Sequence, residues 1–457
     1  MLEHGHQNHQ DGLIVIGAGA AGVFGAIRCV EQYPAARVTI LEKNARPLGK
    51  VRVSGGGRCN VTHACFDVRE LTRNYPRGGR SLTGSFTRFG PADTIDWFER
   101  RGVALKTEAD GRVFPVSDSS ASIIDCLLRR VRELRIELLC GHSVQSIEVL
   151  DAHAGFRVRL AGQANRVGRR VLLTTGGDER SLKLAADCGH TIVSPVPSLF
   201  AMNWRRSEPM DLNGSPSSPN TSHTKEALSE LAGISISDAA VRLEIQVPVG
   251  AGYKSVLFQR RGALLITHHG FSGPVILQLS SLAARELYAV QYRARLEIDW
   301  TPELNREQKA QCLHAMRRNA GARMTDSAPE GFSGPRRLWR FLIANARASG
   351  QKWSQVSADS QRAILENWSA ATFHLDGRAT HKAEFVTAGG VALNEVDLRS
   401  MQSKRRPGLY LAGEVLDVDA FTGGFNFQNA WTGGWLAGES IAADLSQNAD
   451  EIRFSRE

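Results

Sequence analysis

A glycine-rich segment near the N-terminus constrains this chain more than any other feature. Gly17-Ala18-Gly19-Ala20-Ala21-Gly22 directly follows the apolar run Gly12–Ile16 and opens a helical stretch from Ala20 to about Gln32. A short, continuous apolar run is typical of a buried parallel strand. A second such run, Arg37–Leu41, follows the helix. Together they predict a βαβ unit, and the fold class is therefore α/β with a Rossmann-type domain.

The spacing of the three glycines predicts dinucleotide binding at this turn. Gly17 permits the tight turn, Gly19 lets the backbone approach a pyrophosphate, and Gly22 allows the helix to pack closely on the strand. The helix begins at Ala20 and Ala21, where unpaired N–H groups and a partial positive charge would meet the diphosphate. A purely structural glycine turn is the alternative.

An acidic residue ends the second predicted strand. Glu42 lies twenty residues after Gly22, where a carboxylate can accept hydrogen bonds from ribose hydroxyls. We place its neighbour Lys43 among the same cofactor contacts. An acid at this position argues against a 2′-phosphate, so the dinucleotide is predicted to be FAD or NAD(H) and not NADP(H).

Two further segments carry glycines beside polar residues. Gly49–Asn60 contains three consecutive glycines next to Arg58, which suits close approach to a ligand phosphate or carbonyl oxygen, although a flexible loop is equally consistent. Near the C-terminus, a predicted strand ends in Gly413 and Glu414, an acid of the kind that contacts the ribityl chain in many flavoproteins. Thr422–Gln428 then opens a helix whose N-terminus would stabilise charge on a reduced flavin.

Several motifs resemble one known family. S-G-G-G-R-C-N-V-T-H at 54–63, T-H-H-G-F-S-G-P at 267–274, V-T-A-G-G-V at 386–391 and G-E-V-L-D-V-D-A-F-T-G-G-F-N-F-Q-N-A at 413–430 are similar to BaiN/YhiN-like flavoproteins, also called the aminoacetone oxidase family of FAD-binding enzymes. The resemblance covers about 12–445. It implies FAD on a glutathione-reductase-like Rossmann domain, interrupted by a β-rich and a small helical domain. The contacts expected with FAD then include Gly57, Arg58, Asn60, Gly413, Glu414, Gly424, Phe425, Asn426 and the backbone of Val144.

The chain departs from the family pattern in two places. After Thr175-Gly176-Gly177 the family usually continues with a glycine-rich turn, whereas this chain reads Asp178–Lys183. The loop at 203–227 resembles an insertion. The domain boundaries that we expect are 11–197 and 372–446 for the two parts of the FAD-binding domain, 198–300 for the β-rich domain and 301–371 for the helical domain, with flexible tails at 1–10 and 447–457.

The predicted helical domain is strongly basic. Residues 301–352 contain ten Lys/Arg and four Asp/Glu, and the whole chain carries a formal net charge of +9. A solvated helical face is the default interpretation. The alternative is a phosphate-facing surface with Trp339, Phe341 and Trp353 as aromatic platforms for RNA bases.

The reaction follows partly from what the sequence lacks. No second G-x-G-x-x-G follows a strand and no C-x-x-C pair is present, so NADH or NADPH would act only as a transient electron donor. The resemblance implies a small amino ketone, a bile-acid enone or a uridine of large-subunit ribosomal RNA as substrate, and the positive charge favours RNA. A small-molecule oxidase or enone reductase and a non-catalytic RNA-binding factor are the alternatives.

Three side chains are candidates for donating a proton to the reduced bond, namely Cys59, His268 and His269. For each, a structural role is the competing interpretation. The seven cysteines form an odd set without metal-ligand spacing, which predicts no disulfide framework, no metal site and a cytoplasmic location. The sequence shows no signal peptide and no apolar run long enough to cross a membrane.

Overall fold

The computed structural model describes residues 11–150, 155–204, 230–319, 321–379 and 386–454. The predicted tail at 1–10, the last three residues of the tail at 447–457 and most of the loop at 203–227 lie outside the described residues. The chain forms two compact units: unit 1 comprises 1–196 and 386–457, and unit 2 comprises 197–385.

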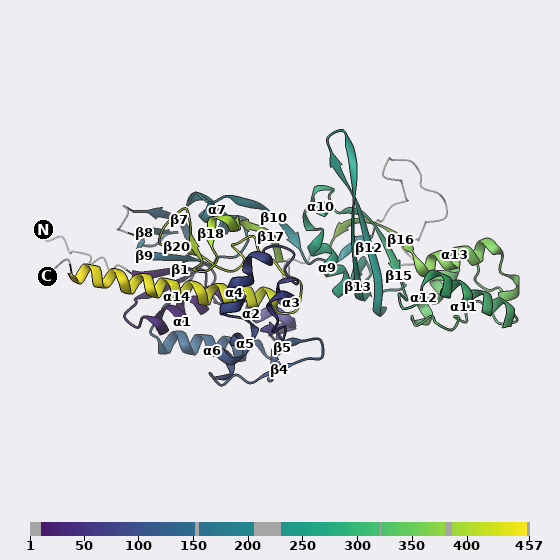
Figure 1. The fold of residues 1–457 in the computed structure, drawn as a ribbon, viewed down its shortest axis with the longest axis horizontal. Coiled ribbons are helices and arrows are strands. Elements are labelled where there is room, and N and C mark those ends of the chain that lie inside the picture. The colour runs from purple at the N-terminus through teal and green to yellow at the C-terminus, as the bar shows by residue number, and fades with distance from the viewer. Residues whose placement is uncertain (1–10, 151–154, 205–229, 320, 380–385, 455–457) are drawn as a thin grey trace. The chain divides into compact units, whose positions relative to one another are not determined.

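Unit 1 is built on a parallel sheet whose central strands come from the predicted βαβ unit (Figure 1). The helix α1 (Ala20–Gln32) connects β1 (Asp11–Ile16) to β2 (Val38–Glu42), and these strands pair in parallel from Leu13 with Val38 onward. The order of the parallel strands is β20-β9-β1-β2-β6, with β6 at Glu137–Cys140, β9 at Arg166–Leu173 and β20 at Leu409–Leu411. The apolar residues of β1, β2 and β20 are buried, as continuous apolar runs predict, whereas those of the edge strand β6 are half-buried.

Helices and small sheets complete unit 1. Antiparallel strands extend the main sheet: β7 (Val144–Val149) and β8 (Phe156–Leu160) join through β9, and β18 (Val396–Asp397) and β19 (Gln402–Ser403) join through β20. The other strands are β3 (Thr62–His63), β4 (Leu105–Thr107), β5 (Arg112–Pro115), β10 (Ile192–Ser198) and β17 (Val386–Val391). The other helices are α2 (Gly49–Val53), α3 (Val68–Thr72), α4 (Thr83–Arg88), α5 (Pro91–Glu99), α6 (Ser120–Glu133), α7 (Glu179–Asp187) and α14 (Phe425–Phe454).

The helices α1 and α14 lie side by side over the sheet (Figure 1). Glycines allow the close approach: a Cβ added to Gly434 would lie 2.5 Å from the Ala21 carbonyl oxygen, and one added to Gly438 would lie 2.5 Å from that of Gly25. Because these contacts are with backbone atoms, a larger residue would force the two helices apart.

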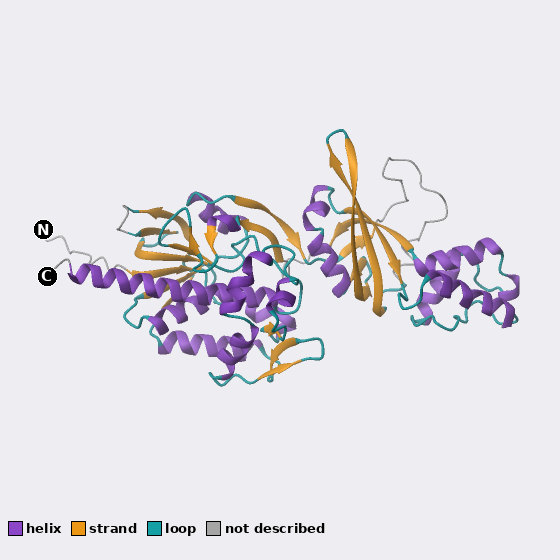
Figure 2. Cartoon of the chain, viewed as in Figure 1, coloured by secondary structure: helices purple, strands orange, loops and turns teal. Residues whose placement is uncertain are grey.

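Unit 2 contains a closed barrel and a group of helices (Figure 2). The strand order is β11-β14-β13-β12-β15-β16, with bounds Met202–Trp204, Gly270–Ser272, Gly252–Ile266, Ser235–Val249, Arg293–Asp299 and Ala371–Arg378 in that order. The helices are α9 (Pro274–Leu282), α10 (Ala284–Ala289), α11 (Arg306–Asn319), α12 (Arg336–Asn345) and α13 (Ala358–Ser369). One hydrophobic core runs through barrel and helices.

The observed boundaries differ from the expected ones in three respects. Unit 1 resumes at residue 386 and not at 372, because β16 pairs with β15 and β11 and so closes the barrel. The barrel and the helices form one unit, since they share a core. The expected tail from 447 begins inside α14, which continues to Phe454. No helix in the described part of the chain combines the length and apolar character needed to cross a membrane.

Candidate functional site

The glycine turn after β1 is held in a conformation that only glycine allows. Gly17 has a φ of +102°, and a Cβ there would lie 2.7 Å from the Thr174 carbonyl oxygen. A Cβ at Gly22 would lie 2.1 Å from the Gly17 carbonyl oxygen. The hydroxyl of Thr174, directly after β9, donates to the carbonyls of Ile16 (3.0 Å) and Gly17 (2.9 Å). The close glycine contacts and the hydrogen bonds of Thr174 together fix the conformation of this turn.

Open space lies beside this turn, as a bound diphosphate requires. A Cβ at Gly19 would meet no atom within 4 Å. No side chain caps α1, and its first turn contains no acid, so no carboxylate competes for the helix N-terminus at Ala20 and Ala21. The hydroxyl of Thr175 is buried without a hydrogen-bond partner, and its Cα would lie 3.1 Å from a Cβ at Gly17. An anion with oxygen acceptors fits this cradle.

Glu42 holds the end of β2 against the glycine turn. Its Oε2 accepts from the Ala18 N–H (2.9 Å), and its Oε1 accepts from the backbone and side-chain N–H groups of Asn44 (2.8 and 2.6 Å). A carboxylate can accept about four hydrogen bonds, so Oε2 retains capacity for a ribose hydroxyl. Lys43 turns instead to Asp178, with a distance of 3.1 Å between its Nζ and Oδ2. The His142 N–H donates to the Glu42 carbonyl (2.8 Å), two residues before Val144 begins β7.

A second glycine–acid pair lies at the same edge of the sheet. Gly413 and Glu414 follow β20, and a Cβ at Gly413 would lie 3.2 Å from the Ala21 Cβ in the first turn of α1. The Glu414 carboxylate accepts a hydrogen bond from Lys50 of α2. Since parallel strands end at a common edge, residues distant in sequence meet where dinucleotides bind in such sheets.

The turn before α14 brings four of the expected contacts together. Gly424 has a φ of +92°, and a Cβ there would lie 2.5 Å from the Thr62 carbonyl. With its amide oriented to satisfy the neighbouring donors and acceptors, Asn60 accepts a hydrogen bond from the Gly424 N–H (2.9 Å). The ring of Phe425 stacks on His63, with 4.6 Å between centroids. Asn426 exchanges two hydrogen bonds of 3.0 Å with the backbone of Ala420.

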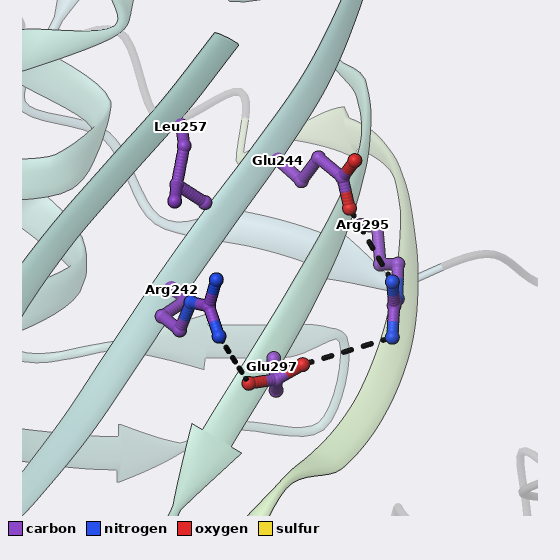
Figure 3. A pocket seen from close by; sticks show the side chains of 5 residues that line it. All are labelled: Arg242, Glu244, Leu257, Arg295 and Glu297. Atoms are coloured by element: carbon purple, nitrogen blue, oxygen red, sulfur yellow. Dashed lines mark hydrogen bonds and ion pairs between the residues drawn. The ribbon is translucent and has the colours of Figure 1, made fainter. Parts of the chain in front are cut away.

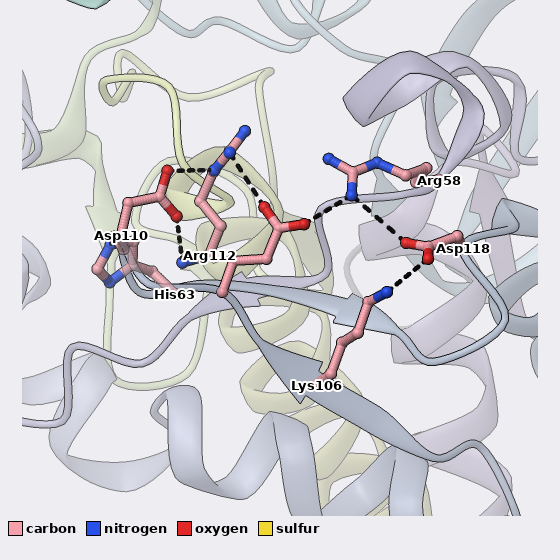
Figure 4. Close-up of polar contacts among 7 residues, drawn as sticks. Arg58, His63, Lys106, Asp110, Arg112 and Asp118 are labelled. Carbon is pink, nitrogen blue, oxygen red and sulfur yellow. Dashed lines mark hydrogen bonds and ion pairs between the residues drawn. The ribbon is translucent and has the colours of Figure 1, made fainter. Parts of the chain in front are cut away.

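Arg58 is already paired with protein carboxylates (Figure 4). Its Nη1 lies 2.7 Å from Glu108 Oε1 and 3.4 Å from Asp118 Oδ1, and the guanidinium lies 3.9 Å from the centre of the Phe114 ring. Hydrogen bonds from Lys106 and then Arg58 lower the pKa of Asp118, which keeps the pair charged. Arg58 thus holds its loop against the β4–β5 strands, whereas the neighbouring Gly57 (φ +85°) borders open space.

The proton-donor candidates lie in different surroundings. Cys59 is fully buried at a φ of +61°, and burial raises the pKa of its thiol to about 12. His268 and His269 are exposed in the turn between β13 and β14 of unit 2.

Two polar side chains at the site, Thr175 and His63, were not predicted from the sequence. Burial lowers the pKa of His63, and its Nδ1 is enclosed without a partner. Both lie in segments with a glycine turn or a family-like motif, and that pattern is the signal by which they could have been found.

The charged side chains in one pocket of unit 2 neutralise one another. A pocket on the barrel is lined by Arg242, Glu244, Leu257, Arg295 and Glu297 (Figure 3). Arg242 pairs with Glu297 (3.3 Å) and Arg295 pairs with Glu244 (3.3 Å). Within the described ranges, no three His, Cys, Asp or Glu side chains gather as metal ligands would.

The aromatic-platform prediction was wrong. Trp339 and Trp353 are 0% and 1% exposed and Phe341 is 6% exposed, because all three fill the core of unit 2. No base could stack on them without unfolding the helices.

The fold, this cofactor cradle and the family match together identify the chain as a Rossmann-type flavoprotein, an FAD-dependent oxidoreductase. The chain belongs to the family described as the HI0933-like protein Rossmann domain, whose model matches residues 11–440. The resemblance drawn from its motifs is thereby confirmed.

Curated relatives match along almost the whole chain. A ribosomal RNA dihydrouridine synthase of Escherichia coli is 28% identical over 95% of this chain and 98% of its own length. A 3-dehydro-bile acid delta(4,6)-reductase of Clostridium scindens is 26% identical over 94% of this chain and 98% of its own. Among solved structures, a 3-ketosteroid-delta4-(5alpha)-dehydrogenase of Rhodococcus jostii covers 95% of this chain and 97% of its own at 13% identity, with a TM-score of 0.49.

Proposed function

We propose that this protein uses FAD to reduce a carbon–carbon double bond, and that the substrate is a uridine of large-subunit ribosomal RNA, which becomes dihydrouridine. Two relatives matched over 94–95% of the chain carry the name ribosomal RNA dihydrouridine synthase. The observation that favours RNA in this chain is the excess of exposed cations on the helices of unit 2. Such charge suits a phosphate-rich partner.

The residues at the sheet edge have separable tasks in this proposal. The N-terminus of α1 and the hydroxyl of Thr175 would hold the diphosphate, and Glu42 would accept from the adenosine ribose. Glu414, whose carboxylate accepts a hydrogen bond from Lys50, would contact the ribityl chain. Bound FAD, when reduced, supplies a hydride to one carbon of the double bond.

The second carbon must receive a proton, so that two electrons and two protons in total saturate the bond. Cys59 is enclosed and holds its proton tightly, so in this conformation its thiol could act only through a change in the loop. His63 lies beside the turn before α14 and has one nitrogen without a partner. The candidates are therefore Cys59, His268 and His269, which the sequence indicated, and His63, which the structure adds. NADH or NADPH is the proposed source of electrons.

The second candidate function is reduction of an enone or oxidation of a small amine or ketone. The name of the Clostridium scindens relative favours it, because that protein is called a bile-acid reductase. A flavin-containing RNA-binding factor without turnover is the third candidate.

The test uses purified protein and its visible spectrum. The flavin would be reduced by NADH or NADPH without oxygen, and reoxidation would be followed with unmodified ribosomal RNA, with RNA that already contains dihydrouridine, and with air alone. We expect reoxidation that requires unmodified RNA and leaves dihydrouridine detectable by mass spectrometry. Rapid reoxidation by air with indifference to RNA would identify an oxidase, and RNA binding without any change in the RNA would identify the non-catalytic factor.

A further inference from the structure

Two stretches of unit 2 contain cations but no acids. Residues 308–325 include four Lys/Arg and residues 331–358 include five, and neither stretch contains Asp or Glu. In sequence the two stretches belong to different helices and loops. Their charges form one surface only if the fold brings them together.

Backbone hydrogen bonds join the two stretches at one corner of the helical group. The Trp353 N–H donates to the Arg323 carbonyl (3.0 Å), and the Thr325 N–H donates to the Gln351 carbonyl (2.9 Å). The Gln351 side chain donates to the Arg347 carbonyl (2.9 Å), which fixes the loop after α12 to the same place.

The last turn of α11 leads into this corner and carries two further cations, Arg317 and Arg318. The Ser354 N–H donates to the Gly321 carbonyl (3.0 Å), so the chain leaving α11 is tied to the segment that follows Lys352. We call the resulting surface the basic corner; its members are Arg317, Arg318, Arg323, Arg347 and Lys352.

The cations of the basic corner differ from three other arginines of unit 2, Arg306, Arg340 and Arg362. All five are exposed, and none forms an ion pair with an acid among the described residues. By contrast, Arg306 lies 3.7 Å from Glu366, Arg340 lies 3.6 Å from Asp326, and Arg362 lies 3.4 Å from Asp359. A patch of unshared charge attracts polyanions more strongly than a patch of ion pairs does.

The backbone at Arg347 lies in the left-handed region. Arg347 has a φ of +56° at the position after Ala346, the C-cap residue of α12, where glycine is the unstrained residue. A glycine at this position would therefore relieve strain while removing one cation of the basic corner.

We propose that the basic corner binds the phosphate backbone of folded RNA without reading its sequence. The choice of RNA as the partner rests on the proposed function. Trp339 and Trp353 are buried beneath the corner. The corner therefore presents charged side chains, and neither indole ring is accessible for a base to stack on. Phosphate contacts of this kind position an RNA and leave base recognition to another site. An acidic protein is the competing partner.

The experiment compares two variants that lose the same charge. Arg317→Gln/Arg323→Gln/Lys352→Gln removes three members of the basic corner, and Arg306→Gln/Arg340→Gln/Arg362→Gln removes three arginines that are paired with acids. Binding of the FAD-loaded protein to a labelled transcript of large-subunit ribosomal RNA would be measured by fluorescence anisotropy from 50 to 200 mM KCl. Since each phosphate contact adds about 0.7–0.9 to the slope of log Kd against log salt, the corner variant should lose about 2 from that slope. The control variant should lose less than about 1.

A single substitution separates binding from folding. Arg347→Gly removes a cation and relieves the left-handed backbone, so it should melt at or above the temperature of the unmodified protein while binding RNA more weakly. Lower affinity together with a lower melting temperature would contradict this explanation.

The remaining outcomes distinguish the two proposals. Equal losses in the two triple variants would overturn the basic corner, because only total charge would matter. Unchanged RNA binding in the corner variant, with dihydrouridine still formed by the unmodified protein, would overturn the corner and leave the proposed function standing. Corner-dependent RNA binding without dihydrouridine formation would support the basic corner and overturn the proposed function. Competition by polyglutamate as effective as that by RNA would assign the corner to an acidic protein.

Discussion

Alanine substitutions at Gly22 and Gly19 should affect different properties. Gly22→Ala should lower stability, whereas Gly19→Ala should weaken FAD binding. A Cβ at Gly22 would lie 2.1 Å from the Gly17 carbonyl oxygen and 2.5 Å from the Thr174 hydroxyl. Side-chain Cβ atoms essentially never approach such atoms within 3.0 Å, so α1 must move by about 0.9 Å, the difference between 3.0 and 2.1 Å. A Cβ at Gly19 would meet nothing.

The expected magnitude for Gly22→Ala combines two terms. Overpacking against fixed backbone costs about 3 kcal/mol at the upper end of the usual range. The better helix propensity of alanine returns at most about 1 kcal/mol. The net loss of about 2 kcal/mol should lower the melting temperature of the FAD-free protein by about 2–4 °C, at about 1–2 °C per kcal/mol for a protein of this length.

Gly19→Ala should leave the melting temperature of the FAD-free protein within about 1 °C of the unmodified value, since overlap with other atoms is absent and surface changes usually cost under 0.5 kcal/mol. Its methyl group would occupy the space that we assign to the diphosphate. Loss of one hydrogen bond to a charged group, about 1.5–3 kcal/mol, would weaken FAD binding roughly 10- to 150-fold.

Thermal unfolding of FAD-free protein and titration with FAD, followed by quenching of flavin fluorescence, measure the two effects separately. Normal FAD affinity in Gly19→Ala would refute the diphosphate cradle. An unchanged melting temperature in Gly22→Ala would refute the packing argument.

Three further predictions concern single residues. Glu42→Ala should lower both the FAD content, read from the ratio of visible to ultraviolet absorbance, and the melting temperature, because the carboxylate also holds Ala18; an unchanged absorbance ratio would exclude the ribose contact. The hydrogen bond from Arg405 is the main cause that lowers the pKa of Glu395 to about 2, so stability from this carboxylate is complete above its ordinary pKa of 4.5 and is lost as the pH falls towards 2. Melting curves of Glu395→Gln and the unmodified protein should therefore differ at pH 7 and converge near pH 2–3, and parallel curves would contradict the assignment. Burial raises the pKa of Cys59 to about 12, so a thiol-specific disulfide reagent at pH 8 should leave Cys59 unmodified while the half-buried Cys312 reacts. Mass spectrometry of the labelled peptides measures this, and modification of Cys59 would contradict the prediction.

The sequence by itself determined the Rossmann core and the position of its cofactor turn. The apolar run before Gly17 marks a buried parallel strand. The spacing of the glycines is set by the clashes that a Cβ would make with backbone atoms in any chain of this topology. The helix predicted from Ala20 to about Gln32 has the same bounds in the structure. Such requirements are local or involve the backbone alone, so they can be recognised in the residues themselves.

Only the tertiary structure decided how side chains with two plausible roles are used. Trp339 and Trp353 have a spacing that fits either a core or a stacking platform, and packing with the barrel places both in the core. Arg58 could have faced a phosphate, but Glu108 and Asp118, which lie fifty and sixty positions later, take its charge.

The same reason explains the barrel boundary and the basic corner. From the sequence, residues from 372 onward were assigned to the second part of the FAD-binding domain, whereas β16 pairs with β11, far earlier in the chain. The cations of the corner belong to one surface because Arg323 and Trp353 meet through their backbones. Burial, strand closure and charge sharing depend on contacts between distant segments, and these contacts are set by the folded chain as a whole and not by local sequence.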